Sequence, residues 1–252
     1  MSVAVQLGFA FVAGAVGGAM NALAGGGTFA TLPSLLALGL PANTANATSN
    51  VALLPGAGMS AWAFRDELGP VGGVGVRLLS AITFAGGLVG SVLLVRTPTH
   101  AFDLIIPWLV LYAFVVLAFG KAASGWLQRR VTIGRNTLLT VQLLLGIYGG
   151  YFGGGVGLMT TATYGLLAGH TPRELFAPRT LMLAIANLAA AIVFIAAGMV
   201  MWWACLPMLA GSILGGWGGA HIGKRLPASA VRVWTLLVTG VTAAVFFWRA
   251  YG

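Results

Sequence analysis

The chain has 252 residues, of which 59% are hydrophobic and 7% are charged, and its mean hydropathy is +0.96. Soluble domains carry about 25% charged residues, so this chain has too little charge to cover the surface of a cytosolic enzyme. Disordered chains are polar and poor in apolar residues, which excludes disorder. A polytopic protein in a lipid bilayer remains, and at about 20 residues per span the length allows roughly eight to ten segments.

The net charge of +9 comes from 13 Lys and Arg residues against 4 Asp and Glu residues. The basic residues do not form one dense tract. They lie in short gaps between apolar runs, where they act as orientation signals at a membrane surface. We therefore predict no nucleic-acid partner. The single cysteine, Cys205, lies in an apolar run and is interpreted as a packing residue.

Ten apolar segments are predicted, all helical, because backbone exposed to lipid must satisfy its own hydrogen bonds. They cover residues 3–24, 28–40, 44–65, 72–95, 102–120, 136–153, 156–168, 174–198, 203–222 and 229–248. Eight are long enough to cross a bilayer. Segments 28–40 and 156–168 have 13 residues each and reach about 20 Å, short of the roughly 30 Å hydrocarbon core.

Both short segments directly follow a triple glycine, which indicates an internal repeat. Gly18 precedes the triplet 25–27 by the same spacing as Gly146 precedes the triplet 153–155. Each half then supplies three longer segments. Chance spacing in a glycine-rich chain is the alternative, but the matching order of short and long segments favours two copies of a five-segment unit, each with a broken or hairpin pair.

The predicted organisation is a single transmembrane domain over 1–252, and the distribution of charge favours inverted repeats. Repeat one is 1–120, a basic cytoplasmic linker is 121–135, and repeat two is 136–252. If each short segment folds back beside its predecessor, eleven Lys and Arg residues fall on or near the inner side and only Arg96 and Arg249 fall outside. Parallel repeats would give about seven against six. The positive-inside rule therefore predicts an inner-membrane protein with both termini outside the cytoplasm.

Helices broken near the middle of a membrane are typical of transporters, which bind substrates at the exposed helix ends. A helix N-terminus carries partial positive charge and free N–H groups, so it favours an anion. Glycine lets the backbone approach a ligand closely. The candidates for such contacts are Gly26, Gly27, Thr28, Gly154 and Gly155. The alternative is that these glycines only permit tight bends and helix packing.

Polar side chains follow each break and complete the candidate substrate site. In the first half they are Asn46, Thr48, Ser49 and Asn50, and in the second half Arg179, Thr180 and Asn187. Arg179 is a candidate countercharge, since its planar guanidinium suits oxyanions; snorkelling to the inner surface is its alternative. Asn43 and Thr44 are interpreted as cap residues. Weaker candidates beside the breaks are Asn21, Thr31, Tyr148 and Tyr151.

Several signals of other functions are missing from the sequence. The four carboxylates lie near segment ends, which disfavours a carboxylate proton relay or cation pathway. There is no phosphate-binding GxxxxGK[ST] loop, no HExxH zinc motif and no G-x-S-x-G nucleophile elbow. We therefore predict no enzyme activity, no cofactor and no metal site.

The run 25–35 (Gly-Gly-Gly-Thr-Phe-Ala-Thr-Leu-Pro-Ser-Leu), followed by Ala-Thr-Ser at 47–49, resembles the sulfite exporter TauE/SafE family of membrane transporters. The glycines at 153–155 and the helix with Arg179 fit its duplicated layout, although the second copy has Arg-Thr-Leu at 179–181. The resemblance implies a secondary transporter for a small, sulfur-containing anion such as sulfite or a sulfonate. A transporter or channel for another small solute is the alternative, and the sequence is compatible with a homo-oligomer.

Overall fold

A computed structural model describes residues 2–127, 134–168, 174–223 and 226–252, and these residues are almost entirely helical. The helices are α1 (Val3–Leu23), α2 (Thr28–Ala37), α3 (Ala42–Ala63), the 3₁₀ helix η1 (Arg65–Glu67), α4 (Val76–Arg96), α5 (Thr99–Leu127), α6 (Arg135–Tyr151), α7 (Val156–Ala168), α8 (Phe176–Ala196), α9 (Trp202–Gly223) and α10 (Ala228–Tyr251). The predicted all-α fold is confirmed, and each predicted segment corresponds to one α-helix. No strand occurs in the described ranges, where the only β-type pairing is an isolated bridge between Val71 and Val74.

The largest differences from the predicted boundaries are at α4 and α5. α4 starts at Val76 rather than residue 72, because Gly72 and Gly73 have φ of +54° and +75° and turn the chain first. α5 extends beyond the predicted 102–120 at both ends, to Thr99–Leu127. Five described helices are apolar and long enough to cross a membrane: Val3–Leu23, Val76–Arg96, Thr99–Phe119, Phe176–Ala196 and Ser229–Tyr251. The protein is therefore a multi-pass membrane protein.

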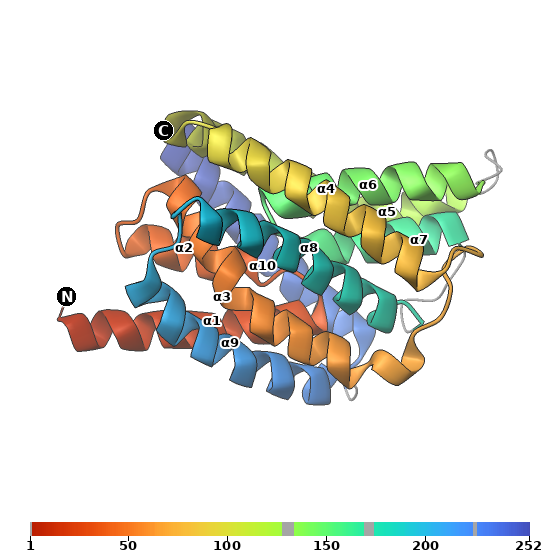
Figure 1. Ribbon diagram of the computed structural model, residues 1–252, viewed down its shortest axis with the longest axis horizontal. Helices are drawn as coiled ribbons and strands as arrows, with labels where there is room; N and C mark the ends of the chain where they lie inside the picture. Colours follow the sequence, from red (N-terminus) through yellow and green to blue (C-terminus); the bar gives the residue numbers. More distant parts are fainter. Residues whose placement is uncertain (1, 128–133, 169–173, 224–225) are drawn as a thin grey trace.

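Six of the α-helices form two three-helix bundles (Figure 1). Bundle one contains α1, α3 and α9, and bundle two contains α4, α6 and α8; the two meet where α3 packs on α8. Glycines let the helices within each bundle touch backbone to backbone. A Cβ atom added to Gly18 of α1 would overlap the backbone of Ser212 in α9, and one added to Gly90 of α4 would overlap that of Ile147 in α6. Each bundle thus combines helices from both halves of the chain.

The main helix contacts are related by the repeat. When α1–α5 are exchanged with α6–α10 in order, these contacts correspond to one another. The contacts α1–α9 and α3–α9 correspond to α6–α4 and α8–α4, while α3–α8 and α5–α10 correspond to themselves. In Figure 1, α3 runs from left to right and its counterpart α8 runs from right to left. Both observations support the predicted inverted repeat, which remains a proposal.

The basic residues are distributed unevenly between the two ends of the molecule. The chain termini lie at one end, where α4 and α8 finish (Figure 1). At the opposite end, α3 finishes and α4, α6 and α10 begin, and these helix ends carry Arg65, Arg77, Arg135 and Arg232. This distribution agrees with the charge asymmetry on which the predicted orientation rests; the orientation itself stays a prediction.

Candidate functional site

Two short non-helical segments interrupt the paired helices at the centre of the fold. Break one (24–27) separates α1 from α2, and break two (152–155) separates α6 from α7. Gly25 and Gly153 have φ of +79° and +76°, a conformation that side chains with a Cβ avoid. Each donates its N–H to the carbonyl five residues earlier, at 3.1 and 3.4 Å. The two halves of the chain thus share one local geometry at the same place.

Break one contacts the first turn of α7, directly after break two. A Cβ atom added to Gly25 would overlap the backbone of Gly157, and one added to Gly157 would lie 2.7 Å from the Cα atom of Gly25. Only glycine at both positions allows this approach. The C-termini of α1 and α6 and the N-termini of α2 and α7 are therefore gathered in one region, at the interface of the two bundles.

Arg179 from α8 binds the end of α1 across this interface. Its Nη2 atom donates to the Ala22 carbonyl at 2.9 Å, and its guanidinium lies over the ring of Phe176 at 4.3 Å. The C-terminal carbonyls of a helix are the negative end of its dipole, so they favour this cation. The residue is only 5% exposed, which does not agree with the snorkelling alternative. Within the described ranges no carboxylate pairs with it.

Asn46 from α3 makes the corresponding contact at the end of α6. Its Nδ2 atom donates to the Tyr151 carbonyl at 3.1 Å. One turn further along α3, Asn50 donates to Asn187 of α8 at 3.5 Å, and its Nδ2 atom lies 3.0 Å from the position of a Cβ on Gly153. A helix of each bundle therefore contributes a polar side chain to the broken helix of the other bundle.

Four buried side-chain atoms in the described part of the chain have no hydrogen-bond partner: Asn21 Nδ2, Asn46 Oδ1, Asn50 Oδ1 and Arg179 Nε. All four belong to residues beside the two breaks. Leaving a buried polar group unpaired costs about 1–3 kcal/mol, and native proteins contain few of them. Their concentration in this region, on residues that are 0–5% exposed, marks it as the candidate site for a polar ligand.

The sequence profile described as "Sulfite exporter TauE/SafE" matches residues 10–246 of this chain. The chain belongs to the sulfite exporter TauE/SafE family. Proteins of this family are membrane transporters rather than enzymes, so the predicted absence of enzyme activity holds. The predicted resemblance, made on the glycine breaks and the residues that follow them, is confirmed.

Three relatives match over most of their length. The "Probable membrane transporter protein YfcA" of Escherichia coli K12 is 28% identical over 98% of this chain and 91% of that protein. A "Probable membrane transporter protein" of Haemophilus influenzae is 30% identical over 91% of both chains. The "Probable membrane transporter protein ORF9" of a Sinorhizobium species is 31% identical over 87% of this chain and 82% of that protein. No solved structure matches the chain.

Within this TauE/SafE protein, most predicted site residues lie around the breaks. The residues that do so are Gly26, Gly27, Thr28, Asn46, Asn50, Gly154, Gly155, Arg179 and Asn187. The glycines were expected to direct free N–H groups at a ligand, and their contacts in the structure differ from that expectation. The N–H of Gly27 already donates to Asn21 Oδ1 at 2.6 Å. Cβ atoms on Gly154 and Gly155 would meet the rings of Phe152 and Phe29 rather than a polar group.

Three predicted hydroxyl residues are engaged elsewhere. Thr48 accepts the N–H of Met201 at 3.0 Å, and so joins α3 to the start of α9. Ser49 bonds the hydroxyl of Thr31 at 2.5 Å and holds α2 against α3. Thr180 donates to carbonyls of its own helix at 2.9 and 3.0 Å. Thr48 and Ser49 therefore fix helices around the site, whereas Thr180 bonds only within α8.

Two weaker candidates are more important than the sequence indicated. Asn21 fixes the Gly27 N–H and keeps a free donor, and the Tyr148 hydroxyl donates to the Gly154 carbonyl at 2.8 Å. The signal for Asn21 is present in the sequence, since it is the one amide in the second half of α1 and lies six residues before Gly27. The signal for Tyr148 is weaker, because tyrosine is also a common packing residue in membrane helices.

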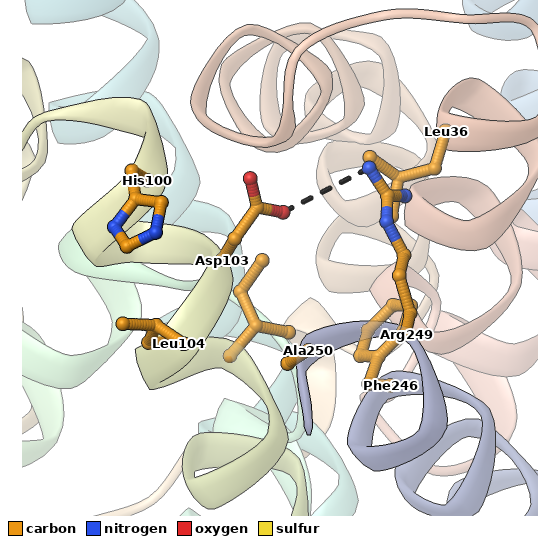
Figure 2. Close-up of a pocket in the computed structure, with 8 residues that line it drawn as sticks. Leu36, His100, Asp103, Leu104, Phe246, Arg249 and Ala250 are labelled. Atoms are coloured by element: carbon orange, nitrogen blue, oxygen red, sulfur yellow. Dashed lines mark ion pairs between the residues drawn. The ribbon is translucent and has the colours of Figure 1, made fainter. Parts of the chain in front are cut away.

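A separate polar pocket lies at the end of the molecule that carries the termini. Figure 2 shows Asp103 of α5 and Arg249 of α10 pointing toward each other across it, with an Asp103 Oδ1 to Arg249 Nη2 distance of 3.8 Å. The cavity measures about 260 Å³. Both side chains are more than a third exposed, and exposed pairs contribute about 0–1 kcal/mol at most. Since this pair satisfies its own charges, the pocket is a weaker candidate than the centre.

Proposed function

We propose that this transporter carries a small, sulfur-containing anion by alternating access. The anion binds between the two helix breaks. Membership of the TauE/SafE family makes the chain a membrane transporter for a small solute. The charge of that solute is inferred from the side chains at the breaks. Arg179 carries the observation on which the proposal rests: a buried cation with no carboxylate partner among the described residues.

Two buried hydrogen-bond donors without acceptors accompany the charge of Arg179. Arg179 Nε and Asn21 Nδ2 are both buried without an acceptor. An oxyanion supplies acceptor oxygens and a negative charge, so it satisfies both donors and compensates the guanidinium. A cationic or purely apolar solute would leave these groups as they are. The site at break one is therefore suited to an anion.

The preference for a sulfur-containing anion is supported by the family description, which names sulfite. Sulfite and sulfonates present several oxygen atoms around one sulfur, which matches the planar donor fork of an arginine. The names of the relatives describe them as probable membrane transporters and give no substrate. We extend the sulfite description to this chain on the chemistry of Arg179.

Alternating access is supported by the burial of the site. Asn46, Asn50, Asn187 and Arg179 are 0%, 2%, 3% and 5% exposed, so a solute reaches them only if helices separate. The contacts Arg179–Ala22 and Asn46–Tyr151 both join bundle one to bundle two. Glycine packing holds each bundle together, and so movement between the bundles exposes the site with the least loss of packing.

The test is anion-dependent thermal stabilisation of the purified protein. Sulfite, sulfoacetate, taurine and chloride are titrated in sodium gluconate at constant ionic strength, with the wild type, Arg179→Gln and Arg179→Lys. A charge-assisted hydrogen bond contributes about 1.5–3 kcal/mol, so Arg179→Gln is expected to weaken anion binding roughly ten- to a hundredfold, and Arg179→Lys to recover part of it.

Arg232→Gln is the matched control, because Arg232 also donates to a backbone carbonyl, Ala118, at 2.9 Å but is exposed on α10. It is expected to bind anions like the wild type. Anion affinity that is unchanged in Arg179→Gln would refute the proposed role of Arg179. Flux measured in proteoliposomes separates a carrier from a channel, since carrier flux saturates with substrate concentration.

A further inference from the structure

The N-terminus of α7 is buried, and its first N–H groups have no hydrogen-bond partner in the described part of the chain. The first N–H groups of any helix lack partners within that helix, and in α7 they belong to Val156, Gly157 and Leu158. Val156 is 1% exposed, Leu158 is 8% exposed, and Gly157 is buried between them. The first backbone bond of the helix is donated by Met159 to the Gly155 carbonyl, at 3.0 Å. A buried helix end with free donors requires a partner from outside the helix.

The N-terminus of α2, the counterpart of α7, is capped by its own chain. The N–H groups of Phe29 and Ala30 each donate to the carbonyl three residues earlier, at 3.1 and 3.0 Å. The Gly27 N–H donates to Asn21 Oδ1 at 2.6 Å. These donors are therefore occupied before any ligand arrives.

α7 lacks the side chain that caps α2. The glycine triplets start at residues 25 and 153, and the same spacing relates Asn21 to Gly149, which has no side chain. A Cβ atom added to Gly149 would lie 3.0 Å from the Cβ atom of Ala186, so the packing leaves little room for a longer cap. The two halves of the chain therefore differ here, since α2 is closed and α7 is open.

The side chain of Arg179 passes this open terminus. Its Cγ atom lies 3.4 Å from the Cβ position of Gly157, in the first turn of α7. Its Nη2 atom binds the Ala22 carbonyl at the end of α1. The Nε atom, which lies between Cγ and Nη2 along the side chain, has no partner, although the residue is only 5% exposed. Because a helix N-terminus carries partial positive charge, it repels the guanidinium unless an anion compensates both.

We propose that the transported anion binds at the N-terminus of α7, where the N–H groups of Val156, Gly157 and Leu158 and the Nε atom of Arg179 donate to its oxygen atoms. This inference rests on the proposed function and names the groups that bind the substrate. An oxyanion has several acceptor oxygens, so one oxygen binds the helix end while another binds the guanidinium. A halide offers a single atom to both groups. We therefore expect sulfite to bind more tightly than chloride.

Val156→Pro tests the helix end directly, because proline removes the N–H and suits the first position of a helix. Sulfite binding is measured by thermal stabilisation of the purified full chain in sodium gluconate at constant ionic strength. Loss of one hydrogen bond to a charged group is expected to weaken sulfite binding roughly ten- to a hundredfold. Val76→Pro is the matched control, since Val76 is the first residue of α4 and also follows a glycine. It is expected to bind sulfite like the wild type.

Hydrogen–deuterium exchange of the wild type gives a second measurement that needs no variant. Sulfite is expected to slow the exchange of the N–H groups at residues 156–158, resolved with overlapping peptides. The N–H groups of Phe29 and Ala30 should exchange at an unchanged rate, because they already have backbone partners. A buried water molecule at α7 would also satisfy the free donors, but it would give no protection that depends on sulfite.

The results distinguish failure of this site from failure of the proposed function. Sulfite binding that requires Arg179 but is unchanged in folded Val156→Pro would overturn the α7 site and leave the anion proposal standing. Sulfite binding without protection of residues 156–158 would do the same, and this result decides the question if Val156→Pro does not fold. If no anion stabilises the wild type, the proposed function and the α7 site are both refuted.

Discussion

The contact between break one and the first turn of α7 can be tested with three Gly→Ala variants that separate its components. Gly25 has φ of +79°, and an added Cβ would overlap Gly157. Gly39 has φ of +87°, but nothing lies within 4 Å of an added Cβ. Gly157 has no positive φ, yet its Cβ would lie 2.7 Å from Gly25 Cα. Gly39→Ala therefore measures backbone strain, Gly157→Ala measures the collision, and Gly25→Ala measures both.

The expected losses differ enough to be resolved. A positive φ costs a residue with a Cβ about 1–2 kcal/mol, which is the expected effect of Gly39→Ala. Overpacking costs about 1–3 kcal/mol, and here the upper part applies because backbone atoms cannot rotate away. Helix propensity returns roughly 0.5–1 kcal/mol in Gly157→Ala, which leaves a net loss of about 2 kcal/mol. The sum for Gly25→Ala is then about 3–5 kcal/mol.

The assay is the melting temperature of each purified variant in one detergent, followed by tryptophan fluorescence. At about 2–4 °C per kcal/mol for a domain of this size, Gly25→Ala should melt roughly 6–20 °C below the wild type. Gly157→Ala gives the most direct refutation. If break one does not touch α7, that change only improves helix propensity, and its melting temperature would equal or exceed that of the wild type.

The remaining predictions concern a polar network and the orientation of the chain. Gln142 donates to Thr83 at 2.6 Å and accepts from Tyr164 at 2.7 Å, and all three residues are buried. Gln142→Leu should therefore lower the free energy of unfolding by about 1–3 kcal/mol. Adding Tyr164→Phe should recover part of the lost melting temperature. A cysteine at Ser124, in a Cys205→Ser background, should react with an impermeant thiol reagent only after the inner face is opened; labelling from outside would reverse the predicted orientation.

The fold was predictable because each of its signals is local. Apolar runs define membrane helices, and the glycine triplets mark the two breaks in the sequence itself. The comparison of the two halves then indicated the short helices. Helix ends were less predictable where a turn precedes the helix, as at Gly72 and Gly73, since consecutive glycines in an apolar chain are compatible with both a turn and a first helical turn.

The polar residues beside the breaks could be selected from the sequence, but their partners could not. Polar side chains in membrane helices are costly unless they bind a partner or a ligand. For this reason the sequence indicates Asn46, Asn50 and Arg179 as candidate site residues. Their contacts span 105, 137 and 157 residues along the chain. No local pattern indicates that Arg179 binds the end of α1. The sequence is compatible with snorkelling, and that alternative is excluded only by the burial of Arg179 against α1 of bundle one.

The two halves of the protein share their architecture but differ in the side chain that binds the opposite helix end. α8 presents the arginine at α1, and α3 presents the asparagine at α6. Two identical half-sites would bind the same ion twice, and two arginines would also repel each other. The loss of symmetry at these two positions leaves a single cationic side chain at the breaks, which is what the proposed site for one anion requires.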